Sequence, residues 1–283
     1  MTTAAEHKER QRLQWSEAAE SWNALYEWYT GTFGPVIAWS VDAAELAPGM
    51  KLLDIGCGCG QPALTAAPRV GPSGAVVGID ISGEMLVHAA RRAEANGLHQ
   101  VSFREMDAER LEFEGDSFDA VTCSCALMFF PDPVGALKEM HRVLKSGGRL
   151  VVGVWDEPAR NSFVTLGGQS VAEFFPAPAG PPDPMAPNAF RFARPGSLET
   201  TIGDAGFRDI HIDRRTVGID FASPDEYWGI FSQMAAGARQ KVLQMSESNR
   251  ARLRALVNDS ARAHEIDGRL RLTATLQCAS ARK

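Results

Sequence analysis

Between residues 50 and 155 the chain alternates short apolar runs with longer amphipathic stretches. The apolar runs have the length and composition of buried strands, and they cover residues 51–55, 75–79, 101–105, 118–123 and 149–155. Stretches with helical periodicity separate them, beginning near Gln61-Pro62, at Ser82 and at Pro133. Strands that alternate with helices of this length predict a parallel sheet with helices on both faces. The pattern therefore predicts an α/β fold.

The two flanking regions follow a different pattern. Residues 8–29 place apolar and aromatic side chains at helical spacing, Gly34-Pro35 interrupts the pattern, and a short helix is expected over 36–46. After Trp155 the sequence predicts three further helices and two further strands. The helices are expected at 196–205, 225–244 and 247–264, and the strands at 207–214 and 269–281.

Two segments of the C-terminal half, 156–195 and 222–268, are too long to be simple connections, and we expect them to form a helical lid. The chain then divides into three parts. Residues 1–48 form an N-terminal helical cover, residues 49–156 form the ligand-binding core, and residues 157–283 complete the core sheet and carry the inserted lid segments.

The clearest candidate site is the loop that follows the first predicted strand. The strand ends in Asp54, and Gly56, Gly58 and Gly60 follow at alternate positions. Glycine lets the backbone turn sharply and approach a ligand closely, because no Cβ stands in the way. The second strand ends in another acid, Asp80. A glycine loop after a first strand, with a carboxylate about 20 residues further on, is typical of a nucleoside pocket.

Composition and charge narrow the function. The chain has 283 residues and a formal net charge of -6, which is unfavourable for a nucleic-acid phosphate backbone as partner. The sequence contains no run of 18 or more apolar residues, so it predicts no membrane span. The first ten residues are polar, so we expect a cytoplasmic protein. The five cysteines lack zinc-like spacing; we expect reduced thiols and no metal.

The glycine spacing also separates two classes of nucleotide cofactor. The dinucleotide fingerprint is G-x-G-x-x-G, whereas this loop has G-x-G-x-G. Four further segments accompany the loop in the same order along the chain. They are Gly78-Ile-Asp80-Ile-Ser82, Met106-Asp107-Ala108-Glu109, residues 116–123 and residues 139–150. Together with the loop they resemble the class I S-adenosylmethionine-dependent methyltransferases, and more closely the ubiquinone/menaquinone-biosynthesis (UbiE-like) branch.

The resemblance implies a Rossmann-like, seven-stranded, mostly parallel sheet and S-adenosyl-L-methionine as the cofactor. The implied roles are the methionine carboxylate on the backbone of the loop, the ribose hydroxyls on Asp80, the adenine between Ile81 and Met85, and the adenine edge at Asp107 and Ala108. The implied cofactor-binding residues are Asp54, Gly56, Cys57, Gly58, Gly60, Asp80, Ile81, Met85, Asp107, Ala108 and Cys123.

The same resemblance implies in-line methyl transfer to a small, largely apolar acceptor of specialised metabolism, favouring carbon or oxygen over nitrogen. Aromatic and apolar side chains at the carboxyl edge of the sheet are the candidate acceptor residues. They are Trp22, Tyr29, Met128, Phe129, Trp155 and Phe192. No general base can be named; His264, Tyr227 and His211 are the candidates.

Two other functions remain open from the sequence. One is a nicotinamide-dependent oxidoreductase, which the loop spacing disfavours, and the other is a protein that binds the cofactor without catalysis. The sequence leaves the oligomeric state open between monomer and homodimer.

Overall fold

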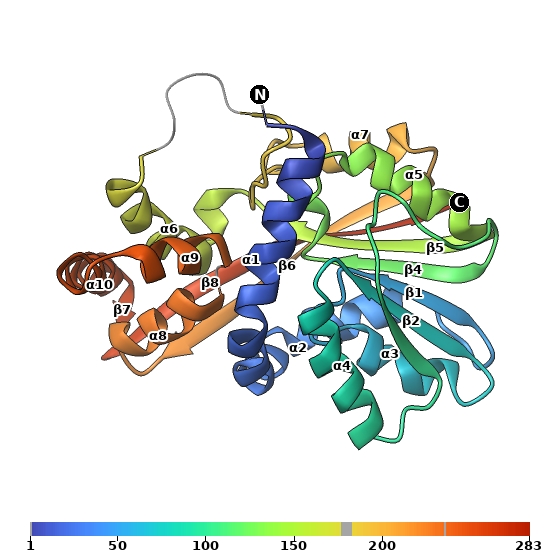
Figure 1. The fold of residues 1–283 in the computed structure, drawn as a ribbon, viewed down its shortest axis with the longest axis horizontal. Coiled ribbons are helices and arrows are strands. Elements are labelled where there is room, and N and C mark those ends of the chain that lie inside the picture. Colours follow the sequence, from blue (N-terminus) through green and yellow to red (C-terminus); the bar gives the residue numbers. More distant parts are fainter. Residues whose placement is uncertain (1, 177–182, 235) are drawn as a thin grey trace.

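A computed structural model describes residues 2–176, 183–234 and 236–283. Its centre is one sheet with the strand order β3-β2-β1-β4-β5-β8-β6, and the short β7 pairs with β8 (Figure 1). The strands are β1 (Lys51–Ile55), β2 (Ala75–Asp80), β3 (Val101–Glu105), β4 (Phe118–Ser124), β5 (Leu144–Trp155), β6 (Arg208–Phe221), β7 (Glu265–Ile266) and β8 (Arg269–Arg282). Apart from the two-residue β7, this is the seven-stranded sheet that the sequence predicts.

The first five strands are parallel, and the strand order reverses between β1 and β4. Leu52 on β1 pairs with Val76 on β2 and with Ala120 on β4. The carboxyl ends of β1, β2 and β4 therefore lie at one edge of the sheet, on both sides of the reversal. Ligands of open α/β sheets bind in the crevice at this place. Strand β8 is antiparallel to both β5 and β6.

Both faces of the sheet are covered, as predicted. Leu52 and Leu53 are both fully buried although they point to opposite faces, because side chains alternate along a strand. Leu52 packs in a cluster with residues of α2 (Tyr26–Ala43) and α3 (Ala63–Val70). Leu53 packs in a second cluster, with α5 (Pro133–Val143) and α7 (Ser197–Asp204).

The remaining helices gather over the far halves of β6 and β8. They are α6 (Ser162–Phe174), α8 (Pro224–Met234), α9 (Ala236–Gln244) and α10 (Glu247–Ala261), with the 3-10 turns η2 (Pro158–Arg160) and η3 (Arg262–His264). Their apolar side chains share one cluster with Phe221 of β6 and Leu270 of β8. The predicted lid segments therefore contain these helices; residues 177–182 of the first segment lie outside the described residues. The proposed three-part division of the chain stays a prediction.

Helix α1 (Ala4–Ala24) crosses the molecule between the lid helices and α4 (Gly83–Ala95), and it contacts α4, α8 and α9 (Figure 1). The predicted helix over 8–29 is split at Leu25, where α1 ends and α2 begins. The predicted break at Gly34-Pro35 is wrong, because α2 continues through Pro35. Phe33, Val36 and Ile37 are buried around the proline, and this packing holds the helix together.

None of the described helices combines the length and the apolar character needed to cross a membrane.

Candidate active site

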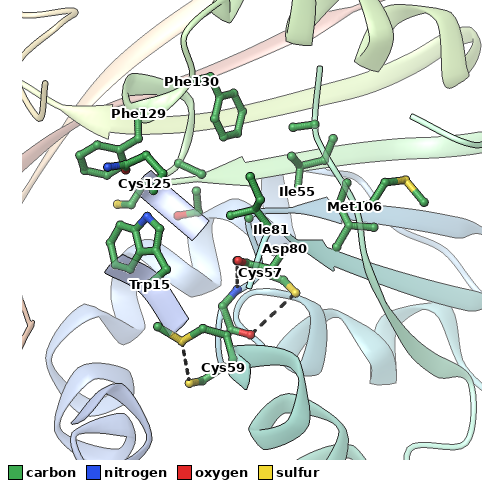
Figure 2. A pocket seen from close by; sticks show the side chains of 18 of the residues that line it. Trp15, Ile55, Cys57, Cys59, Asp80, Ile81, Met106, Cys125, Phe129 and Phe130 are labelled. Carbon is green, nitrogen blue, oxygen red and sulfur yellow. Dashed lines mark hydrogen bonds between the residues drawn. The ribbon is translucent and has the colours of Figure 1, made fainter. Parts of the chain in front are cut away.

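A pocket opens at the carboxyl ends of β1, β2 and β4, beneath α1 and the first turn of α2. The glycine loop after β1 forms its floor, and the segments after β2, β3 and β4 form its sides (Figure 2). Eleven predicted site residues line it: Trp22, Tyr29, Gly56, Cys57, Gly58, Asp80, Ile81, Met85, Asp107, Ala108 and Phe129. The structure therefore brings most of the predicted cofactor residues and half of the predicted acceptor residues to one cavity.

The glycine loop is fixed against the neighbouring strand by its own backbone. The N–H groups of Gly56 and Cys57 both donate to the carbonyl oxygen of Ile79, at 2.8 and 3.0 Å. Gly56 has a φ of +68°, and a Cβ built there would lie 2.4 Å from the Cβ of Ala126. A side chain at this position would push the loop away from the segment after β4. Gly58 also has a positive φ, of +50°, but a Cβ there meets nothing within 4 Å.

Asp80 connects the loop to the second strand. Its Oδ2 accepts a hydrogen bond from the N–H of Gly58 at 2.9 Å, and its Oδ1 accepts one from the N–H of Ser82 at 3.0 Å. Burial raises the pKa of Asp80 and outweighs these two hydrogen bonds, which lower it. Each carboxylate oxygen has a further lone pair, so the oriented carboxylate can still accept hydroxyl groups from the pocket.

Three predicted cofactor residues lie beneath the pocket, among side chains that do not line it. Asp54 is fully buried; its Oδ2 accepts from the N–H of Ala63 at 2.9 Å, and its Oδ1 accepts from Oγ1 of Thr122 at 2.8 Å. Burial raises its pKa to about 7. Cys123 is also fully buried, and a Cβ at Gly60 would lie 2.6 Å from Cδ1 of Leu64. Asp54 braces β1, β4 and the start of α3, and Gly60 allows the loop to pack on α3.

The segment after β3 forms one end of the pocket, next to the N-terminal part of α1. Met106 lies there (Figure 2), followed by Asp107, Ala108 and Glu109. The Oδ2 of Asp107 accepts a hydrogen bond from Nζ of Lys8 at 2.7 Å, and Lys8 also pairs with Glu109 at 2.7 Å. Burial disfavours the charged ammonium, but the two carboxylates outweigh it and raise the pKa of Lys8. This ion pair closes α1 over the pocket.

The opposite end of the pocket is aromatic. Trp15 packs edge-to-face on Phe129, with ring centroids 5.7 Å apart, and lies 6.1 Å from Trp22. Trp22 packs edge-to-face on Tyr29 at 5.5 Å, and its Nε1–H donates to the carbonyl oxygen of Met234 at 3.1 Å. Figure 2 shows Trp15 and Phe129 together with Cys125, on the side of the pocket away from Met106. These rings support one another and form a rigid apolar wall.

The other predicted acceptor residues do not line this cavity. Met128 is fully buried in the core, although its neighbour Phe129 in the 3-10 turn η1 (Leu127–Phe129) lines the pocket. Adjacent residues of such a turn point in different directions. Phe192 is buried in the same core as Met128. Trp155 packs edge-to-face on Phe33 at 6.0 Å.

The three candidate general bases also lie away from the lining. Tyr227 is fully buried on α8; its hydroxyl donates to the carbonyl oxygen of Phe163 at 2.9 Å and accepts from the N–H of Gly167 at 3.0 Å. His211 is 75% exposed on the edge strand β6. His264 belongs to η3, at the far end of α10. All three therefore lie outside the pocket that the described residues form.

Several lining residues were missed in the sequence. Trp15 lies two helical turns before Trp22, and this spacing on one helix face was the signal that could have found it. Tyr26 continues this spacing four residues after Trp22, and Gln61 and Cys125 directly follow the glycine loop and β4. Lys8 carried no comparable signal, because it reaches the pocket through a contact with the distant Asp107.

The chain was compared with known proteins. A family model described as "Methyltransferase domain" matches residues 46–170, which include the glycine loop and β1 to β5. Nocamycin O-methyltransferase of Saccharothrix syringae is 35% identical over 194 residues, or 64% of this chain and 68% of that protein. The chain belongs to the S-adenosylmethionine-dependent methyltransferase family.

A second relative and a solved structure agree with this membership. Aklanonic acid methyltransferase DauC of Streptomyces sp. (strain C5) is 42% identical over 118 residues, which are 42% of this chain and only about half, 54%, of that protein. The crystal structure of the YcgJ protein from Bacillus subtilis has a TM-score of 0.60 at 22% identity, and covers 87% of this chain and 97% of that one. This last likeness shows the shared Rossmann-like fold of the methyltransferase.

Proposed function

We propose that this methyltransferase moves a methyl group from S-adenosyl-L-methionine to a small, largely apolar acceptor, at carbon or oxygen in preference to nitrogen. One observation carries the proposal: a single pocket joins a polar end, with Asp80 and Asp107, to an aromatic end, with Trp22 and Tyr29. The names of the two relatives, a nocamycin O-methyltransferase and an aklanonic acid methyltransferase, support a small-molecule acceptor.

The polar end fits the cofactor. Both oxygens of Asp80 are already held by backbone N–H groups, so the carboxylate faces the ribose hydroxyls without reorganisation. Ile81, Met85 and Met106 offer apolar surfaces for the adenine, and Asp107 and Ala108 offer an acceptor and a backbone donor for its edge. The absence of a side chain at Gly56 lets the loop lie close to Ala126, and we place the methionine tail along this loop.

When bound, the cofactor supplies an electrophilic methyl group on a sulfonium centre. The residues of this chain then bind, align and exclude water. The ring wall of Trp15, Trp22 and Phe129 orients the acceptor, and α1 covers the pocket, closed by Lys8 on Asp107. Proximity and alignment of this kind can lower a barrier by several kcal/mol.

We further propose that the enzyme works in the cytoplasm on free small molecules and not on nucleic acid. The net charge of -6 supports this proposal, because a nucleic-acid partner requires a concentrated positive field.

The proposal is tested by titration calorimetry with S-adenosylmethionine and its demethylated product. We expect the wild type to bind both compounds, and Asp80→Asn to bind them about 10 to 100 times more weakly, because charged hydrogen bonds to the ribose are lost. Asp259→Asn removes a carboxylate that pairs with Arg262 on the surface of α10, and it serves as the control with unchanged binding.

Two results would contradict the proposal: no heat with either compound, or equal affinity for the wild type and a folded Asp80→Asn variant. Hydride transfer with a nicotinamide cofactor would instead support the oxidoreductase. Methyl transfer would appear as a mass gain of about 14 Da, one added CH₂, in a member of an acceptor panel. Cofactor binding without any such gain would support a protein that binds the cofactor without catalysis.

A further inference from the structure

The aromatic end of the pocket contains one hydroxyl group for which the proposed function gives no role. Tyr29 lines the cavity from the first turn of α2. Its ring packs edge-to-face on Trp22 at 5.5 Å and lies 5.3 Å from the ring of Phe33. Contacts on two sides fix the ring, so the position of the hydroxyl is set by packing.

The neighbouring Tyr26, by contrast, has a hydroxyl that is already hydrogen-bonded within the protein. The hydroxyl oxygen of Tyr26 accepts a hydrogen bond from Nε2 of Gln61 at 2.8 Å, and the guanidinium of Arg92 lies 3.8 Å from the centre of the Tyr26 ring. Within the described part of the chain, no hydrogen bond satisfies the hydroxyl of Tyr29. The hydroxyl does not belong to the buried polar atoms that lack a partner, so it can be reached from the pocket, and a ligand oxygen can accept its hydrogen bond in place of water.

The protonation state of Tyr29 decides which partner it takes. Burial, and then the nearby Cys125 and Asp54, raise the pKa of Tyr29 far above its usual range. Burial also raises the pKa of Cys125 to about 12. Both groups are therefore uncharged at neutral pH, and the phenol keeps its proton as a hydrogen-bond donor. A donor in apolar surroundings interacts most strongly with an oxygen that carries negative charge.

The backbone near Tyr29 marks the same place. Cys125 directly follows β4 and has a φ of +57°, in the left-handed region that non-glycine residues rarely adopt. Its N–H donates to the carbonyl oxygen of Gly153 on β5 at 2.8 Å, which holds this conformation. Strained backbone of this kind concentrates at functional sites. Cys125 also lies where the strand order reverses, the place at which ligands bind in such sheets.

We propose that Tyr29 binds the acceptor directly, by donating a hydrogen bond from its hydroxyl to an acceptor oxygen that shares negative charge with the reacting atom. The inference rests on the proposed methyl transfer. An oxygen that accepts a hydrogen bond becomes a weaker nucleophile. The reacting atom is therefore a second atom of the same delocalised anion, and not the oxygen bound by Tyr29.

The chemical step balances without a base from the protein. The acceptor loses its proton to solvent and binds as a delocalised oxyanion. A lone pair on its second oxygen, or the electron pair at a conjugated carbon, forms the new bond to the methyl carbon. The bond between that carbon and sulfur breaks, and its electron pair stays on sulfur as a neutral thioether. Where carbon is methylated, the proton of that carbon leaves to solvent. Tyr29 keeps its own proton throughout.

A matched pair of probes tests this assignment. The probes are 2-hydroxy-1,4-naphthoquinone, which is a delocalised oxyanion at neutral pH, and 2-amino-1,4-naphthoquinone, which has nearly the same shape and no charge. Binding is measured by titration calorimetry with the wild type, Tyr29→Phe and Tyr227→Phe, each saturated with S-adenosylhomocysteine. We expect the wild type to prefer the hydroxy compound about 10-fold or more, the scale of one hydrogen bond to a charged group.

In Tyr29→Phe we expect this preference to fall to about 2-fold or less. The reason is that the charged probe loses a strong hydrogen bond with the hydroxyl, whereas the neutral probe loses little. Tyr227→Phe, whose hydroxyl bonds to the backbone of Phe163 and Gly167 outside the pocket lining, should keep the preference. A wild type without preference, including one that binds neither probe, would overturn the assignment, and so would a Tyr29→Phe variant that keeps the preference. A failure of the proposed function is recognised separately, since S-adenosylhomocysteine would then not bind at all.

Discussion

The polar end and the aromatic end of the pocket are built in different ways. At the polar end, Asp80 is held by the N–H groups of Gly58 and Ser82, all within the segments that follow β1 and β2. At the aromatic end, Trp15 meets Phe129 and Trp22 meets Met234, so that contact depends on segments more than 100 residues apart in the chain. In the proposed function, the local hydrogen-bonded frame is the cofactor site, and the acceptor site is shaped by long-range packing.

Helix α1, which covers the pocket, is also held in place by contacts with segments far away in the chain. Only His7, Gln11, Ala18 and Ala19 of α1 are buried, and two of these are polar. Apart from the ring contacts of Trp15 and Trp22, the helix is connected by single polar contacts, such as Lys8 to Asp107 and the indole of Trp22 to α8. Elements with few buried apolar contacts open at low free-energy cost. We therefore expect substitutions in the two ends to separate cofactor binding from acceptor binding.

The largest effect on cofactor binding is expected at Gly56. In Gly56→Ala the new Cβ would stand 2.4 Å from Ala126, in addition to the strain of a positive φ, so the loop must move. We expect binding of S-adenosylmethionine to weaken more than about 100-fold, that is by about 3 kcal/mol or more. Gly97→Ala is the matched control, since its φ of +65° is nearly the same, a Cβ there meets nothing within 4 Å, and it lies outside the pocket lining. Calorimetry and thermal melting of both variants check this; equal losses would contradict the role of the Ala126 contact.

The second prediction concerns pH and the buried carboxyl below the polar end. Because burial raises the pKa of Asp54 to about 7, from 3.8 in the unfolded chain, the native state binds this proton more tightly. Stability from this group is therefore full below about pH 4 and is lost as pH rises to about 7, by up to about 4 kcal/mol. Urea unfolding between pH 5 and 7.5 should show a steeper decline for the wild type than for Asp54→Asn. Parallel curves would mean that Asp54 does not titrate in this range.

The third and smallest effect is expected at the ring wall. Trp22→Ala removes the ring that joins Trp15 to Tyr29. We expect the affinity for 2-hydroxy-1,4-naphthoquinone to fall about 10-fold and that for S-adenosylmethionine to change less than about 3-fold. Trp39→Ala, at a tryptophan of α2 that stacks with Arg215 outside the pocket lining, is the control for a lost indole. If cofactor and acceptor binding fall together, the two ends are not separable.

Much of the core could be read from the sequence, because its signals are local. Strand β1 lies at the predicted residues, and α4 begins next to Ser82 as predicted, where the Ser82 hydroxyl caps the helix by accepting from the N–H of Met85 at 3.3 Å. The helix break was misplaced, since a proline signal near Pro35 was overridden by packing around it. Asp54 carries a site-like signature in the sequence, yet the fold uses it as a buried brace.

The sequence by itself determined the alternating strands and helices, the glycine loop and the acid that faces it, because these depend on backbone conformation and on neighbours a few residues away. Only the tertiary structure decided that Phe129 faces the pocket while Met128 faces the core, that Lys8 reaches Asp107, and that Tyr227 is structural. The physical reason is that such contacts join segments far apart in the chain. Their geometry is fixed by how whole helices pack, which no short pattern encodes.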